Sequence, residues 1–323
     1  MDRKKLEKAA EQGIISQEQI ELLINFDADE DTNGASSNGE EQLRFIRSFG
    51  DIFITLGIIF VSIATAQFEF STSLKIIPVL VLVATTEWLV RVRRLALPGI
   101  ALLISTLYFS SQFIGLSQSD FELANIIVPT VVAILFYWRY RMPFTLMPIA
   151  LGLIGVVSAI IDIDISKAQY IIILYGLSVF AVAMWFDSRD VTRQTRLSDA
   201  AFWLHLLAAP MVVHGVMVSL LVETSSIPFR ELLVILFFLG FFLVALYVDR
   251  RAILVSSVSY AIYAIVELAK NNEIQIENMT LLIFIGFGIF IIVFGVYWYK
   301  IRSIIFKGVS EAALSKYVPA IIR

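Results

Sequence analysis

The feature that most constrains this chain is a series of long apolar runs with few charged residues. A helix that crosses the roughly 30 Å hydrocarbon layer of a membrane needs about 17 to 25 mostly apolar residues. Lipid offers the backbone no hydrogen-bond partners, so each run has to be helical. Hydrophobic residues make up 58% and charged residues 16% of the 323, which is too apolar for a soluble globular domain. The sequence therefore predicts an all-α integral membrane protein.

The apolar runs predict ten transmembrane helices, arranged as hairpins in a domain over residues 43–300. An amphipathic cytoplasmic tail is expected over 301–323, because apolar and basic residues mix there. The ten runs cover residues 49–67, 74–90, 95–114, 123–138, 143–161, 168–186, 200–222, 231–248, 252–268 and 280–299.

Basic residues gather at every second junction between these runs, whereas the other junctions are mostly acidic. Because cytoplasmic loops carry the excess of Lys and Arg, both termini are predicted to be cytoplasmic. An aromatic residue precedes each basic turn from the second span onward, which indicates either a duplicated hairpin or the usual interfacial aromatics. The basic residues are Arg44, Arg47, Arg91, Arg93, Arg94, Arg139, Arg141, Arg189, Arg193, Arg196, Arg250, Arg251, Lys300, Arg302 and Lys307.

The first 26 residues predict a small cytoplasmic helical hairpin. Ser16 and Gln19 form a capping-box pattern that opens its second helix. Its few apolar residues cannot make an independent core, so it is either a surface appendage or an element for oligomerisation or partner docking. Residues 27–42 are acidic and polar, and they predict a flexible linker. No stretch of signal-peptide type occurs in the first 48 residues.

The order of these parts resembles a known family. The segment "LEKAAEQGIISQEQIELLI", the acidic linker and then "FGDIFITLGIIFVSIATAQ" are similar in layout to an uncharacterised bacterial family of polytopic membrane proteins with a domain of unknown function. The resemblance implies the bacterial cytoplasmic membrane as the location. It implies no catalytic or binding residues.

Several classes of function are disfavoured. The chain has no cysteine, which excludes disulfides, thiolate metal sites and cysteine nucleophiles. Its Lys and Arg residues form no block interleaved with aromatics, so we expect no nucleic-acid partner. We find no phosphate-binding loop, nucleophile elbow, paired-histidine zinc helix or dinucleotide fingerprint. We therefore expect neither an enzyme nor a cofactor.

The seventh run carries the chain's two histidines, His205 and His214, on either side of Pro210. At about 100° per residue, nine residues place them on opposite sides of a helix, so they should not form a two-histidine metal site unless Pro210 bends the helix axis. Each could hydrogen-bond to a neighbouring helix for packing, or exchange a proton or bind a ligand.

Two polar stripes complete the candidate residues. In the ninth run, Ser256, Tyr260, Tyr263 and Glu267 share one helical face, and in the third run Ser105, Tyr108 and Gln112 do so. Each stripe could line an aqueous path or hydrogen-bond between helices, and Glu267 could reach outward toward Lys270.

Two features predict structural contacts. Gly152, Gly155 and Ala159, and likewise Gly288 and Gly295, suggest close helix packing. Glu87 and Arg91 form an i,i+4 pair, and Asp249 lies beside Arg250 in the sequence.

Two functional hypotheses follow. The first is a transporter or channel-like protein with a polar path bordered by the third, seventh and ninth spans. The second is a non-transporting membrane scaffold or sensor whose hairpin binds a partner or a second copy. An intramembrane enzyme would need a paired acid, a metal cluster or a nucleophile with its base, and the sequence presents none.

Overall fold

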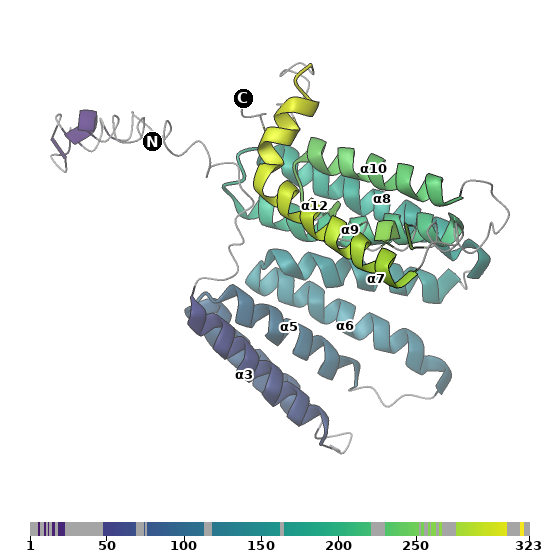
Figure 1. The fold of residues 1–323 in the computed structure, drawn as a ribbon. Helices are drawn as coiled ribbons and strands as arrows, with labels where there is room; N and C mark the ends of the chain where they lie inside the picture. The colour runs from purple at the N-terminus through teal and green to yellow at the C-terminus, as the bar shows by residue number, and fades with distance from the viewer. Residues whose placement is uncertain are drawn as a thin grey trace.

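The computed structural model describes residues 48–68, 76–112, 118–161, 165–220, 230–251 and 276–308. It also describes isolated residues between 6 and 22, residue 74, parts of 253–266, and residues 317–319. Within these residues every regular element is a helix (Figure 1). The elements are α3 (Phe49–Ala66), α4 (Ile76–Thr86), η2 (Glu87–Val92), α5 (Ala96–Ser111), α6 (Gln118–Tyr140), η3 (Pro143–Thr145), α7 (Leu146–Ile161), α8 (Ile165–Arg189), α9 (Arg196–Val218), α10 (Arg230–Val248) and α12 (Ile276–Ile305).

Six helical stretches in the described residues are long and apolar enough to cross a membrane. Large apolar side chains, such as Leu174 and Val296, are 71% and 70% exposed. Water would not tolerate so much apolar surface, whereas lipid does. The expected class, a helical membrane protein, is confirmed. The six stretches are Phe49–Ala66, Leu123–Tyr140, Pro143–Ile161, Ala168–Arg189, Arg196–Met217 and Leu281–Ile305.

The count of ten spans stays a prediction. The runs at 95–114 and 231–248 correspond to shorter apolar helices, Ala96–Ser111 and Leu232–Val248. The run at 74–90 corresponds to α4, which continues directly into the π-helix η2. The ninth run is described only in pieces, and the linker at 27–42 lies outside the described residues.

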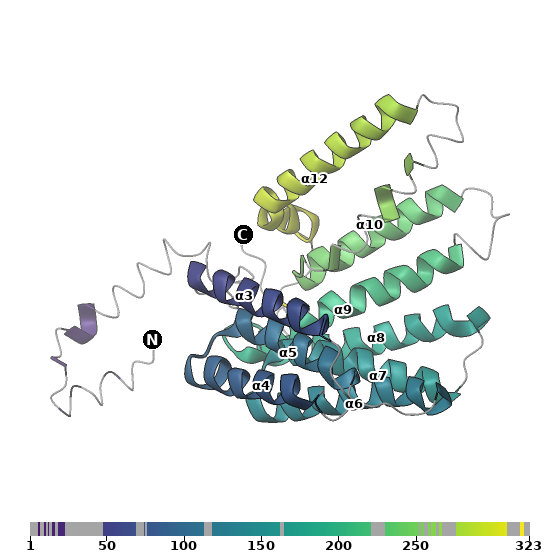
Figure 2. The same ribbon diagram turned by 90° about the horizontal axis from the view of Figure 1, so that it is seen from below.

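The helix α9 is the centre of the structure. Buried residues make up 61% of its apolar window, against 6% for α3. It packs along the whole of α8, and also against α7 and η3. On the far side of α7, α6 and α5 connect the bundle to α3 and α4, while α12 lies outside α10 (Figures 1 and 2). The side chains of α9 therefore make up much of the buried interior of the bundle.

Four connections between the described helices contain a residue with the same left-handed backbone conformation. Arg94, Arg141, Arg193 and Asp249 all have positive φ, between 50° and 60°. Few residues other than glycine adopt this left-handed conformation, which ends a helix and reverses the chain. These residues follow η2, α6, α8 and α10, at the basic junctions of the sequence pattern. The left-handed turn thus recurs along the chain together with the basic junctions.

The helix α12 contains a bend. Tyr297 has non-helical φ and ψ of −103° and 17°. The chain continues as helix to Ile305 in a new direction (Figure 1). The predicted tail at 301–323 therefore begins as the last turn of α12, and Val318, near the chain's end, is buried at 1% exposure.

Local sequence patterns at two helix starts have the expected contacts. The Ser16 backbone N–H donates to Gln19 Oε1 at 2.8 Å, and the Gln19 N–H donates to Ser16 Oγ at 3.2 Å. The predicted capping box is confirmed. A similar box, between Ser48 and Asp51, begins α3.

The predicted glycine contacts are found on α7 but not on α12. A Cβ at Gly152 would lie 2.1 Å from Thr130 Oγ1 on α6, and one at Gly155 would lie 3.0 Å from Ile126. Ala159, in contrast, is exposed. At Gly288 and Gly295 a Cβ would meet no described residue within 4 Å. Among the described residues the predicted close packing is therefore not found at these two glycines.

The glycine contrast gives a direct test. We expect Gly152→Ala to destabilise the protein by about 1–3 kcal/mol, because overpacking forces α6 and α7 apart. Thr130 cannot easily turn away, since its hydroxyl donates to the Ile126 carbonyl at 2.6 Å. Thermal unfolding in mild detergent measures the effect. Gly288→Ala should leave the midpoint temperature of unfolding unchanged. Adding Thr130→Ala to Gly152→Ala should restore the wild-type midpoint temperature. An equal decrease for both glycine variants would contradict the packing described.

Candidate functional site: a buried charged cluster

The turn between α8 and α9 is fixed by one carboxylate. Asp190 accepts hydrogen bonds from the backbone N–H groups of Gln194 and Thr195, at 3.1 and 2.8 Å, and from the Thr195 hydroxyl at 2.7 Å. Thr195 in turn caps α9 through the Leu197 N–H. Burial raises the pKa of Asp190, but the hydrogen bonds from Thr195 and Gln194 outweigh it, so its pKa lies below the ordinary 3.8. This turn holds the start of α9 against the end of α8.

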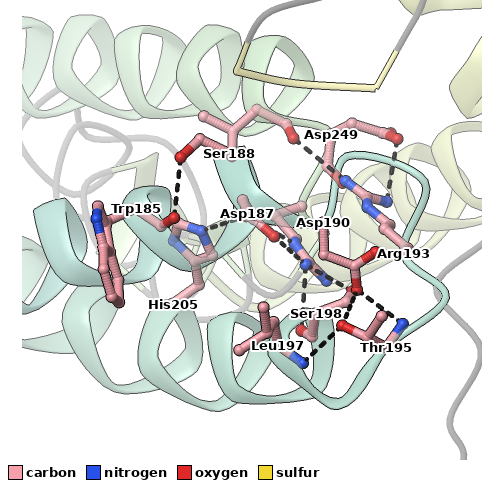
Figure 3. Close-up of polar contacts among 12 residues, drawn as sticks. Trp185, Asp187, Ser188, Asp190, Arg193, Thr195, Leu197, Ser198, His205 and Asp249 are labelled. Atoms are coloured by element: carbon pink, nitrogen blue, oxygen red, sulfur yellow. Dashed lines mark hydrogen bonds and ion pairs between the residues drawn. The ribbon is translucent and has the colours of Figure 1, made fainter.

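Near the end of α8, Asp187 joins the side chains of a histidine and an arginine (Figure 3). His205 Nε2 lies 2.9 Å from Asp187 Oδ2. Arg250 contacts both oxygens of the same carboxylate, with Nε 3.2 Å from Oδ2. All three residues are buried, at 0%, 4% and 2% exposure for His205, Asp187 and Arg250. Because a carboxylate only accepts, this contact requires the proton on His205 Nε2.

Arg250 also contacts α9. Its NH2 group lies 3.2 Å from the Ser198 carbonyl and 3.1 Å from the Ser198 hydroxyl. The ring of Phe180 meets His205 edge to face at 5.1 Å. The group consisting of Asp187, Ser198, His205 and Arg250 therefore connects α8, α9 and the turn after α10.

A second ion pair lies beside the first. Arg193 NH1 is 3.1 Å from Asp249 Oδ2, and Arg193 NH2 donates to the Asp249 carbonyl at 2.6 Å. The indole N–H of Trp298, on α12, donates to Asp249 Oδ1 at 2.6 Å. Arg193 and Asp249 are two of the left-handed turn residues. The turn after α8 is thus bonded to the turn after α10.

Arg302 completes the charged cluster, which we define as these two groups together with Arg302. Its Nε donates to the Leu246 carbonyl at 3.0 Å and its NH2 to the Pro319 carbonyl at 2.8 Å. The carbonyls in the last turn of a helix have no partner inside that helix. Arg302 therefore caps α10 and holds the end of the chain against the bundle.

The charges of the cluster limit what it can do. With neutral His205, three guanidinium groups meet two carboxylates, which leaves one excess positive charge. Protonation of His205 would add another next to Arg250. Buried charges cost several kcal/mol each to desolvate unless they are paired and hydrogen-bonded. Among the described residues no group of three or more His, Asp or Glu could hold a metal ion. The arrangement fits a structural role, in which buried polar contacts hold the helix ends together.

The two histidines lie on opposite faces of α9, as expected from their spacing. His205 is fully buried, whereas His214 is exposed. His214 Nδ1 is hydrogen-bonded to the hydroxyl of Tyr260, in the ninth predicted span. Tyr260 packs beside Val213 and Met217 of α9 and Val234 of α10. The structure thus joins one candidate from the seventh run to one from the ninth.

The other candidates divide into two groups. Ser105 is buried and donates to Ser62 Oγ on α3 at 2.8 Å, while Tyr108 is 48% exposed and Gln112 is exposed at the end of α5. Their helix packs against α3, α4 and α6, away from the His214 contact. Ser256, Tyr263 and Glu267 lie outside the described residues.

Most of the charged cluster escaped prediction from the sequence. The sequence pattern uses Arg193, Arg250 and Arg302 only as orientation signals, and it places Asp249 only beside Arg250 in the chain. The structure pairs Asp249 with Arg193, and Arg250 with Asp187. One signal was available: carboxylates accompany the arginines at the junctions after α8 and α10, whereas the junction after α6 has none.

Comparisons with protein-family models, with curated proteins and with solved structures found no match to this chain.

The ion pairs of the cluster should be far more important for stability than exposed ones. We expect Arg250→Met to lower the free energy of unfolding by about 3–5 kcal/mol, because it leaves Asp187 buried without its partner. Asp187→Leu combined with Arg250→Met should recover much of that loss. Thermal unfolding in detergent measures both.

The matched control is Arg91→Met. Arg91 NH1 lies 2.6 Å from Glu87 Oε1, but the two side chains are 59% and 38% exposed, and exposed pairs contribute little. A similar decrease in the free energy of unfolding for Arg250→Met and Arg91→Met would show that the buried pair stabilises the fold no more than an exposed pair does.

Proposed function

We propose that this chain is a ten-span membrane protein of transporter or channel-like type, with both termini in the cytoplasm. The described apolar helices and the alternation of basic and acidic junctions support the ten spans. The left-handed turns that recur at the basic junctions support the hairpin arrangement. The bacterial cytoplasmic membrane and its lipids are the proposed setting, and oligomerisation through the amino-terminal hairpin is part of the proposal.

One observation carries the transport-like function. His214 is exposed within a predicted membrane span and is hydrogen-bonded to Tyr260 of another. An exposed ionisable side chain at that depth is costly in lipid, so such residues usually face water, an ion or a solute. The path therefore runs along α9 and the ninth span. The third span packs against α3, α4 and α6, so the proposed path no longer includes it.

A second function has its own support. The charged cluster fixes the ends of α8, α9, α10 and α12, as a membrane scaffold or sensor would require. A pocket of about 300 Å³ beside α10 and α12 is apolar and contains none of the candidate polar residues. Its lining residues are Phe238, Ile265, Ile283, Gly286, Phe287 and Phe290. Neither function is enzymatic.

The topology can be tested with single cysteines, because the chain has none of its own. Gln67 follows α3 and Gln194 lies in the turn before α9, and both are exposed. We expect Gln67→Cys to react with a membrane-impermeant maleimide on intact cells, and Gln194→Cys to react only after permeabilisation, since two positions on opposite membrane sides cannot both be reached. Labelling of Gln194→Cys in intact cells would reverse the proposed orientation.

Water access at His214 separates the two functions without knowledge of a substrate. In a polar path, His214→Cys and Tyr260→Cys should react with a charged, membrane-impermeant thiosulfonate, because thiolates form only in water. Leu236→Cys is the control, since Leu236 lies on the neighbouring α10, is 54% exposed and should face lipid. Mass spectrometry of the purified protein measures the labelled fraction. If His214→Cys reacts no faster than Leu236→Cys, the path is ruled out and the scaffold is favoured.

A further inference from the structure

We propose that the ends of η2 and α6 form a binding surface for the phosphate headgroup of an anionic phospholipid. The surface, called here the arginine patch, consists of Arg91, Arg93, Arg94, Arg139 and Arg141, and all five are exposed. It lies on different helices from His214 and Tyr260, so it does not depend on the proposed polar path.

One carboxylate draws the two helix ends together. Glu87 Oε1 accepts from Arg91 NH1 at 2.6 Å and from Arg139 NH2 at 2.5 Å. The latter contact joins η2 to α6 across 52 positions of the sequence. These two helix ends thus carry five guanidinium groups and one carboxylate, which leaves four positive charges in excess.

The other three arginines of the patch have no acidic partner in the described part of the chain. For Arg93, Arg94 and Arg141 no described carboxylate lies within ion-pair distance. Arg94 and Arg141 also have left-handed backbone, with φ of 57° and 50°, where asparagine or glycine would cost less. The backbone thus gives no reason for arginine at these turns, whereas an anionic ligand does.

The patch lies where lipid headgroups should be. Trp88 and Trp138, on the same two helix ends, are 54% and 76% exposed, and tryptophan rings prefer the boundary between hydrocarbon and headgroups. Arg93 lies over the Trp88 ring at 5.5 Å. The apolar side chain of Val92, beside them, is 68% exposed. A surface that combines cations with exposed aromatic and aliphatic groups fits a lipid better than a free anion.

The other half of the molecule uses its arginines differently. Arg193, Arg250 and Arg302 are buried, and their donors are directed to Asp249, Asp187 and backbone carbonyls. Most of the positive charge of these three guanidinium groups is compensated inside the protein, by Asp187 and Asp249. At the arginine patch it remains at the surface, where basic residues attract anionic headgroups.

The test measures phosphatidylglycerol bound to the full chain, by native mass spectrometry of protein released from nanodiscs of phosphatidylcholine with increasing phosphatidylglycerol. We expect Arg93→Gln, Arg94→Gln and Arg141→Gln together to weaken binding by about a hundredfold, the combined effect of three surface cations. Glu87, Arg91 and Arg139 are left intact so that the link between η2 and α6 is kept.

The control removes the same charge elsewhere. Arg196→Gln, Lys300→Gln and Lys307→Gln change three exposed basic residues at other predicted cytoplasmic ends, and should retain wild-type binding. Equal weakening in both triple variants would assign the effect to general surface charge and overturn the proposal. Inorganic phosphate should not displace the lipid at equal concentration; displacement would make the patch a free-anion site and would equally overturn it.

Discussion

The buried contact of Arg250 with Asp187 is the interaction on which the arrangement of the second half depends. Arg250 follows α10, Asp187 lies near the end of α8, and Ser198 and His205 come from α9. Desolvating buried charges costs several kcal/mol each, so the two groups must stay paired and hydrogen-bonded. That requirement fixes the ends of three helices relative to one another, and Arg193 and Trp298 extend it to α12 through Asp249.

The central helix α9 separates two polar environments. Its buried face carries His205 into the charged cluster, and its exposed face carries His214 to Tyr260. Pro210, between them, is exposed. The cluster holds one end of α9, whereas the other end, with His214, is held by apolar contacts with α8 and α10.

The repeated left-handed turn has two different uses in the same molecule. After α8 and α10 the turn residues, Arg193 and Asp249, form a buried ion pair with each other. After η2 and α6 the corresponding residues are both arginine, Arg94 and Arg141, and they are exposed. Two like charges cannot pair, so these turns leave their charge at the surface. The same backbone conformation thus carries a buried ion pair in one half of the molecule and an exposed positive charge in the other.

The sequence by itself determined the membrane class, the positions of the apolar helices that the structure describes, and contacts between residues three or four apart. The Ser16–Gln19 capping box and the Glu87–Arg91 pair follow from helical geometry alone, and so do the opposite faces of His205 and His214. Only the tertiary structure decided that Asp249 pairs with Arg193 rather than with its neighbour Arg250, and that Ser105 meets α3. The reason is physical: periodicity fixes which face of a helix a residue occupies, whereas its partner depends on which other helix packs there.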